Sequence, residues 1–311
     1  MESLGSTLVL KFCQINKEDP EKFNYLPGHE FVISNKQTSF SDFKGKDVVL
    51  KNDLEKEPLS FGRIKPGTPF PQVYFHPKIE SIREKQFEIS IQKTLKSNNY
   101  ILSNLTTANP TSFRIEKTPF LVDKGMIFDL AGTLIEVEEI EPCLKEEDAE
   151  NSLFFFVDVK PKSNLRPDEL ATLALKNKKS NLPKKGEILP PEIKLKIIQT
   201  KMQGKESYKF VPKTQKDDLL VNIGSQKDNE IVIEKIEPVH LIIKYESCAQ
   251  RWVAFSEVEA KGEMNAAYLY LISANEFAMQ AFEKGTKVSV VLRDQMKIGF
   301  GGNELEVNIK K

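Results

Sequence analysis

The chain has 311 residues, about twice the length of a typical domain, so its length favours two domains. It carries 45 lysines and arginines against 45 aspartates and glutamates, and this balance argues against a protein that binds nucleic acid through bulk positive charge. Hydrophobic residues make up 40% of the sequence, which is too many for a disordered chain.

The sequence gives no sign of a membrane or an extracellular setting. No window reaches the ~18 uninterrupted apolar residues of a membrane span, and no cationic stretch precedes the first short apolar run. The cysteines and histidines are scattered along the chain (Cys13, Cys143, Cys248; His29, His76, His240). This usage predicts reduced thiols in an intracellular protein, with no metal site and no cofactor.

Most of the chain has the apolar alternation of short strands. The pattern predicts strands at 48–51, 87–92, 99–105, 112–116, 133–140 and 154–159, and again at 193–200, 218–223, 230–236, 240–245, 252–258, 267–273, 287–292 and 304–309. Few helical patterns lie between them, so the predicted fold class is all-β, built from sandwiches.

One stretch, 163–191, interrupts this pattern. It is rich in Lys, Pro and Asn, and Pro167 with Asp168 marks the start of a short helix near 167–176. We therefore predict a linker with a short helix at 163–191, between domains at 45–162 and 192–311. Residues 1–44 form an N-terminal extension that belongs either outside or inside the first sandwich.

Glycine punctuation recurs in the two halves. Gly62 and Gly125 lie 63 residues apart in the first half, and Gly224 and Gly285 lie 61 residues apart in the second. Similar spacing in two β-rich halves predicts a duplicated module.

The order of motifs in both halves resembles the forkhead-associated (FHA) domain, a β-sandwich whose loops at one end bind phosphothreonine peptides. The family pattern runs Gly-Arg, Ser-Arg-x-His, Asn-Gly-Thr and Leu-x-x-Gly. In the first half it falls on Gly62, Arg63, Arg83 (at the Ser place), Gln86 (at the His place), Asn109 and Thr111.

The second half resembles the same family with more departures. It keeps His240 and has Asn265 for the Asn turn. Ser225 stands where the family has Arg, and Glu237 stands where it has Ser. The resemblance therefore implies two FHA-like sandwiches in tandem, the second of them degenerate.

For the first half, the resemblance implies a phosphopeptide pocket. Arg63 would bind phosphate as a charged fork, Arg83 with Lys85 would replace the missing hydroxyl, and Asn109 would hold the peptide main chain beside Thr111. Two residues oppose this: Glu84 adds a negative charge, and Pro110 stiffens a turn that the family closes with Gly.

For the second half, phosphate binding is not expected. Glu237 would repel a dianion at short range, and Ser225 cannot replace a guanidinium. His240 is expected to brace the loop by hydrogen bonds.

One enzyme alternative exists. The stretch around Asp129 resembles the first motif of haloacid-dehalogenase-like phosphatases, with Ala131 in place of the usual acid and Lys160 in a similar lysine motif. Only 31 residues separate Asp129 from Lys160, too few for the strand–helix units of a parallel sheet.

The sequence thus favours a non-enzymatic component of a larger protein assembly that does not depend on phosphate. The alternative is a phosphothreonine-binding adaptor acting through the first domain. FHA-like domains occur in signalling, DNA-repair and cytoskeletal or ciliary proteins, so the resemblance implies a cytoplasmic or cytoskeletal location, ciliary assemblies included.

Overall fold

The computed structural model describes residues 6–14, 25, 27–42, 44–76, 79–93, 98–141, 154–158, 191–199, 207–257, 266–279 and 286–310. The predicted linker helix near 167–176 lies outside the described residues, as do Cys143, Lys160, Asn265 and Gly285. The all-β fold class is confirmed, because strands form nearly all the regular structure that is described.

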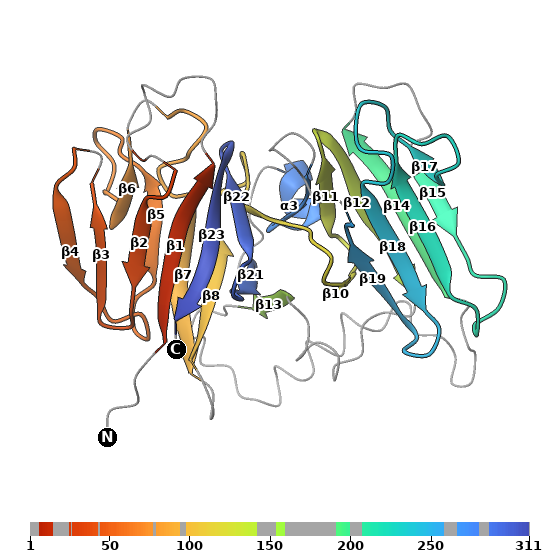
Figure 1. Ribbon diagram of the computed structural model, residues 1–311, viewed down its shortest axis with the longest axis horizontal. Helices are drawn as coiled ribbons and strands as arrows, with labels where there is room; N and C mark the ends of the chain where they lie inside the picture. Colours follow the sequence, from red (N-terminus) through yellow and green to blue (C-terminus); the bar gives the residue numbers. More distant parts are fainter. Residues whose placement is uncertain are drawn as a thin grey trace.

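The strands lie in three sheets (Figure 1). The first half contributes β1 (Thr7–Gln14), β2 (Glu30–Ile33), β3 (Gln37–Ser41), β4 (Asp47–Lys51), β5 (Leu59–Arg63), β6 (Val73–Phe75), β7 (Phe87–Lys93), β8 (Asn98–Asn104), β9 (Ser112–Arg114), β10 (Phe120–Leu121), β11 (Ile127–Leu130), β12 (Thr133–Glu141) and β13 (Phe154–Asp158). The second half contributes β14 (Glu192–Gln199), β15 (Ser207–Phe210), β16 (Leu219–Gly224), β17 (Ile231–Val232), β18 (Leu241–Glu246), β19 (Arg251–Phe255), β20 (Ala267–Tyr270), β21 (Thr286–Val291), β22 (Lys297–Phe300) and β23 (Asn303–Lys310).

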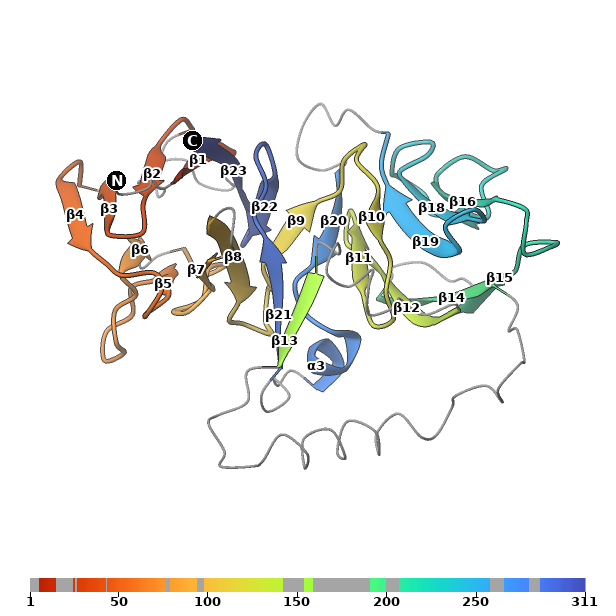
Figure 2. The same cartoon turned by 90° about the horizontal axis from the view of Figure 1, so that it is seen from below.

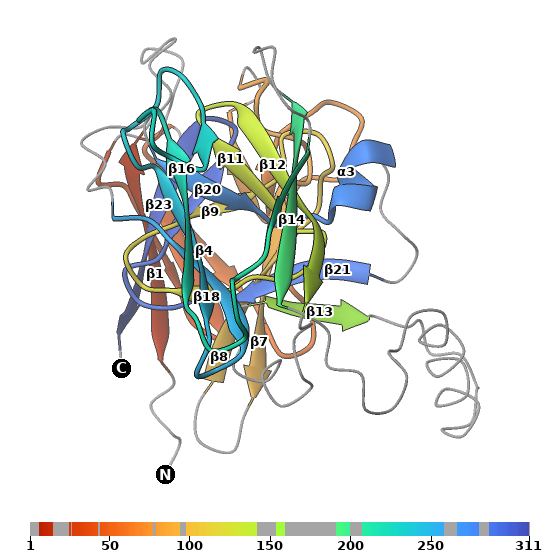
Figure 3. The same cartoon turned by 90° about the vertical axis from the view of Figure 1, so that its right-hand side faces the viewer.

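Two sandwiches share one long sheet. The twelve-stranded sheet has the order β15-β14-β12-β11-β20-β9-β22-β23-β1-β2-β3-β4. A six-stranded sheet, β13-β21-β8-β7-β5-β6, packs on one end of it, and a five-stranded sheet, β10-β19-β18-β16-β17, packs on the other. The view along the long axis in Figure 3 shows the layers of the second sandwich in front.

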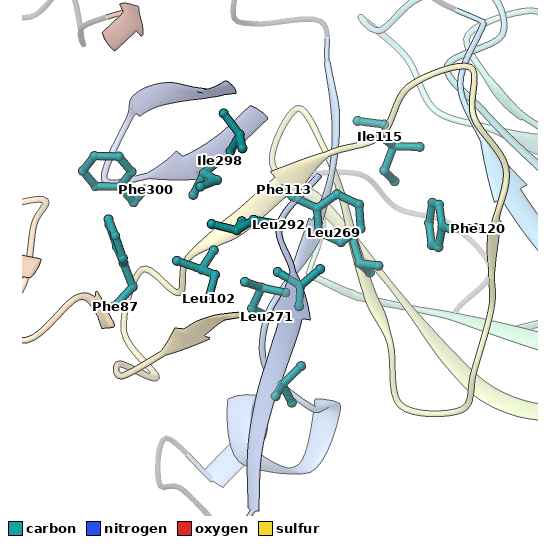
Figure 4. Packing of buried hydrophobic residues seen from close by; sticks show 14 of the residues in the cluster. Phe87, Leu102, Phe113, Ile115, Phe120, Leu269, Leu271, Leu292, Ile298 and Phe300 are labelled. Atoms are coloured by element: carbon teal, nitrogen blue, oxygen red, sulfur yellow. The ribbon is translucent and has the colours of Figure 1, made fainter. Parts of the chain in front are cut away.

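A short antiparallel pair joins the sandwiches. Strand β9 pairs with β20, with Phe113 opposite Leu269 and both side chains buried. Around this pair the apolar side chains of both halves form one continuous core (Figure 4). The seam between the sandwiches is therefore part of the hydrophobic interior.

The strand pairing crosses the predicted domain boundaries. Strands β11 and β12 belong to the first half but pair with β20 and β14 of the second. Strands β22 and β23 belong to the second half but pair with β9 and β1 of the first. Figure 2 shows β21 and β22, coloured blue, beside the strands of the first half. The boundaries stay a prediction, but each sandwich is assembled from both ranges.

The N-terminal extension is part of the first sandwich, one of the two places that the sequence left open for it. Strand β1 pairs with β2 on one side and with β23 on the other. Side chains of β1 alternate inward, so Leu8, Leu10 and Phe12 are buried in the core.

A short helix, α3 (Ala274–Met279), follows β20 and was not predicted. Its start is a capping box: the Glu276 main-chain N–H donates to Ser273 Oγ (3.3 Å), and the Ser273 N–H donates back to Glu276 Oε2 (3.2 Å). The spacing of Ser273 and Glu276 was visible in the sequence. The apolar run before Ser273 placed this residue at the end of the strand predicted at 267–273, so the start of the helix was not recognised.

Candidate functional site at the loop end of the first sandwich

The loop after β5 lies directly against the loop before β7. The main-chain N–H of Arg63 donates to the carbonyl of Arg83 (2.8 Å). A Cβ on Gly62 would lie 2.0 Å from the carbonyl oxygen of Glu84, so only glycine fits there. The structure thus brings Arg63 and Arg83 to the same end of the sandwich, as the sequence predicted.

Gln86 ties this pair of loops to a third. Its Nε2 donates to the carbonyl of Asn109 (2.9 Å), and its Oε1 accepts from the N–H of Arg83 (3.0 Å). The Thr111 hydroxyl donates to the Gln86 carbonyl (3.3 Å). Both Gln86 and Thr111 are fully buried, so they brace the loops and do not face a partner.

Asn109 is the exposed member of the group. Its backbone has a φ of 55°, a left-handed conformation that Asn tolerates better than most residues. Its side-chain Nδ2 donates to the carbonyl of Ser81 (3.3 Å). Asn109 is therefore joined to the loop of Arg83 through Gln86 and Ser81, so the three predicted residues lie at the same loop end of the sandwich.

Glu84 forms ion pairs with two cations of this surface. Its Oε1 lies 3.3 Å from Arg63 Nη2 and 3.1 Å from Lys65 Nζ. A hydrogen bond from its own main-chain N–H, followed by the one from Lys65, lowers the pKa of the Glu84 carboxyl. The carboxylate is therefore charged at neutral pH and partly neutralises the two cations. Arg63 is mostly buried, with 14% of its side chain exposed.

The two other cations that the sequence placed at this site, Arg83 and Lys85, differ from each other in exposure. Lys85 is exposed, whereas Arg83 is half-buried. The Nε of Arg83 is buried without a hydrogen-bond partner in the part of the chain that the structure describes.

The equivalent loops of the second sandwich have the same backbone geometry. The N–H of Ser225 donates to the carbonyl of Glu237 (3.0 Å), as that of Arg63 does to Arg83. A Cβ on Gly224 would lie 2.2 Å from the carbonyl oxygen of Pro238. The predicted equivalence of Gly62 and Gly224 is confirmed by these matching contacts.

His240 takes the place of Gln86 in the second sandwich. Its main-chain N–H donates to the carbonyl of Ile223 (2.7 Å), and its Nδ1 accepts from the N–H of Glu237 (3.4 Å). The side chain is fully buried. Burial lowers the pKa of His240 below its usual value, so the ring is neutral at pH 7 and braces the loop.

Acid should therefore destabilise the protein through His240. The unfolded chain binds a proton at higher pH than the folded chain, so stability falls as the pH drops below ~6.5, by at most about 1.4 kcal/mol per pH unit for this group. We expect His240→Gln, which copies Gln86, to flatten the dependence of the unfolding free energy on pH between 7 and 5. The free energy is measured by denaturant titration.

His29→Gln is a second test of the same effect, because burial also lowers the pKa of His29. The two substitutions should each remove part of the slope, and the double variant should remove more. An unchanged slope in the His240→Gln variant would show that the histidine is not held neutral in the folded state.

Asp129, the nucleophile of the phosphatase alternative, has different surroundings from those that the alternative required. It lies in β11, which runs antiparallel to both β12 and β20, whereas a nucleophile of that class ends a parallel strand. Its Oδ2 accepts from the hydroxyl of Tyr270 (2.7 Å), and its Oδ1 accepts from the N–H of Gly132 (2.7 Å). Burial, followed by the Asp129 charge, raises the pKa of Tyr270.

Two residues of the site were missed in the sequence. Lys65 pairs with Glu84, and Ser81 Oγ donates to the carbonyl of Gly301 (2.7 Å), which lies in the turn between β22 and β23. A signal for Lys65 existed, because it follows the Gly-Arg motif by two residues. No local signal could reveal Ser81, whose partner is 220 residues away.

Comparisons with known proteins gave no match: no family model, no curated protein and no solved structure corresponds to the chain. Among the described residues, no helix is both long enough and apolar enough to cross a membrane. The described residues also contain no cluster of three or more His, Cys, Asp or Glu side chains suited to a metal ion.

Proposed function

We propose that this protein is a non-enzymatic interaction component of a larger intracellular assembly, built on two FHA-like sandwiches that bind protein partners without requiring phosphate. The kinds of assembly proposed include cytoskeletal and ciliary ones. The observation that carries it is the position of Glu84, whose carboxylate already pairs with Arg63 and Lys65. A phosphate approaching these cations would be repelled by the charged carboxylate that already pairs with them.

The second sandwich supports the same proposal. Ser225 and Glu237 lie against each other through the same backbone hydrogen bond that joins Arg63 and Arg83. The equivalent surface therefore has a hydroxyl in place of the guanidinium and a carboxylate where the first sandwich has an arginine. A dianion gains no charged donor from either residue.

A phosphothreonine-binding adaptor is the second candidate. It is favoured by the convergence of Arg63, Arg83 and Asn109 at one loop end and by the exposure of the Asn109 side chain. In that case Glu84 would have to leave its two partners when the peptide binds.

A peptide titration separates the two candidates. The full chain is titrated with a phosphothreonine peptide library and with the unphosphorylated peptides, and binding is followed by fluorescence anisotropy. We expect no preference for the phosphorylated set. A tenfold or greater preference, about 1.4 kcal/mol, would establish the adaptor instead.

Glu84→Gln gives this experiment a matched variant. It removes the negative charge but keeps the shape, so Arg63 and Lys65 are no longer neutralised by a carboxylate. We expect the variant to gain a preference for phosphorylated peptides of about tenfold, because charge-assisted hydrogen bonds contribute ~1.5–3 kcal/mol each. Glu237→Gln in the second sandwich is the control and should gain none, because Ser225 supplies no cation there. Equal behaviour of both variants would contradict the role given to Glu84.

A further inference from the structure

The last hairpin of each half has the same turn. Leu130 pairs with Thr133 at the end of β11 and β12, and Phe300 pairs with Asn303 at the end of β22 and β23. Between them lie Ala131 and Gly132, with φ of 51° and 89°, and Gly301 and Gly302, with φ of 52° and 76°. The two hairpins are thus copies of one another, with the same two-residue turn.

The segment before each hairpin also has a copy in the other half. The N–H of Gly125 donates to the carbonyl of Val137 (2.8 Å), and that of Gln295 donates to the carbonyl of Val307 (2.7 Å). Sequence spacing had matched Gly125 with Gly285, but the hydrogen bonds match it with Gln295. Both residues have positive φ, 84° and 66°.

Each hairpin meets the first strand of a sandwich in the same register. Lys11 of β1 lies opposite Glu306 of β23, and Lys196 of β14 lies opposite Glu136 of β12. Counted from the two turns, Glu306 and Glu136 are equivalent positions. By this charge pattern, either hairpin could pair with β1 or with β14. The pattern therefore does not determine which hairpin pairs with which first strand.

The route of the chain after β9 determines which hairpin pairs with which first strand. After β9, the N–H of Ile115 donates to the carbonyl of Ala267 (2.8 Å), and the carbonyl of Glu116 accepts from Ser256 (3.0 Å). Strand β10 then pairs with β19. The chain leaves the first sandwich at this point and continues into the second.

The exchanged strands fill the cores of the sandwiches that receive them. From the second half, the first sandwich receives the buried side chains of Val290, Leu292, Ile298, Phe300, Leu305 and Val307. From the first half, the second receives those of Phe120, Phe128, Leu130, Ile135 and Val137. Phe300 packs against Phe87, with ring centroids 5.3 Å apart (Figure 4). Without these strands, each core would face water along one side.

We propose that the two halves of this chain are obligate binding partners, each an open sandwich that is completed by three strands of the other half: β10, β11 and β12 from the first half, and β21, β22 and β23 from the second. The surface on each half is the groove that those strands fill, and its occupant is the segment 120–141 or 286–310. A chain cut within 163–191 therefore stays one assembled unit. The loop end described above depends on the exchange too, because Ser81 is held by Gly301.

Cysteine pairs in the full chain test the exchange directly. In a background with Cys13, Cys143 and Cys248 replaced by serine, one variant carries Lys11→Cys with Glu306→Cys. Opposite residues of an antiparallel pair have Cβ atoms ~4.5–5.5 Å apart, close to the span of a disulfide. We expect mild oxidation to remove both free thiols of this variant.

The matched control is Lys11→Cys with Glu136→Cys, the pair that would form if each hairpin folded back on its own half. We expect it to keep both thiols. Disulfide formation in the control and not in the first variant would overturn the proposal. So would a covalent band at twice the chain mass from the first variant, because the pairing would then join two copies of the chain.

Cutting the folded chain tests the second part of the proposal. A protease site is placed within 163–191 of the cysteine-free protein, and the mass in solution is measured by light scattering before and after the cut. We expect the mass of the uncut chain to be retained, and dilution to cause loss of the β-sheet circular dichroism signal as the pieces separate. Two separate pieces that keep their β signal would overturn it.

Discussion

Replacing Gly62 by alanine is expected to lower the free energy of unfolding by about 3 kcal/mol or more, the upper range for overpacking a filled site. The added Cβ would lie 2.0 Å from the Glu84 carbonyl oxygen and 3.0 Å from that of Arg83. Both neighbours are main-chain atoms, so the strand end and the loop must move apart. Denaturant titration followed by circular dichroism measures the change.

Gly67→Ala, in the loop that follows β5, is the matched control. Its φ of 84° costs a substituted residue about 1 kcal/mol, but no atom lies within 4 Å of the added Cβ. We expect the two variants to differ by at least ~2 kcal/mol. Equal losses would mean that the close approach at Gly62 relaxes without cost. Gly224→Ala in the second sandwich should behave like Gly62→Ala, since its Cβ meets the carbonyl of Pro238 at 2.2 Å.

Truncating Trp252 to alanine should be the other large loss, about 3–5 kcal/mol. The side chain is 1% exposed, and its Nε1 donates to the carbonyl of Glu141 at the end of β12 (2.9 Å). The main-chain carbonyl of Trp252 accepts from Val122 (3.0 Å). A residue of the second half thus holds two segments of the first.

Two milder variants separate the causes of this loss. Trp252→Phe keeps much of the apolar volume but removes the donor to Glu141, and we expect a loss of about 1–3 kcal/mol. Tyr245→Phe alters the ring neighbour of Trp252, whose centroid is 5.2 Å away, and should change stability by less than about 0.5 kcal/mol. Calorimetry of the full chain measures all three variants. A single transition that shifts as a whole is expected, because the strands around Trp252 come from both halves; a shift confined to one of two transitions would contradict this.

The surface at the loop end of the first sandwich connects the proposed function with the exchange of strands. Arg63 and Glu84 are held together by backbone contacts within the first half, but the loop that carries Glu84 is braced by Ser81 against Gly301. A substitution at the C-terminal hairpin can therefore alter the proposed binding surface, whose charged residues all lie before residue 90. Any binding experiment on this surface needs the whole chain.

Much of the local structure was determined by the sequence alone. Alternating apolar residues predicted strands such as β7, β12 and β23 within one or two residues, because a period of two places one face in the core wherever the strand lies. The position of Gly62 and the equivalence of Gln86 with His240 were also visible, since close backbone approach and loop bracing depend on a few neighbouring residues.

The partners of the strands were decided only by the tertiary structure. Lys11 and Lys196 face glutamates at equivalent places, so the local pattern is the same whichever hairpin each first strand receives. What separates the alternatives is the direction of the five residues after β9, and Ile115 fixes it by bonding to Ala267 of the other half. That contact joins residues far apart in the sequence, and side-chain periodicity carries no information about such pairs. The pairing of Glu84 with Arg63 and Lys65 was likewise decided by the tertiary structure, because it depends on the pairing of β5 with β7, which brings the two loops together.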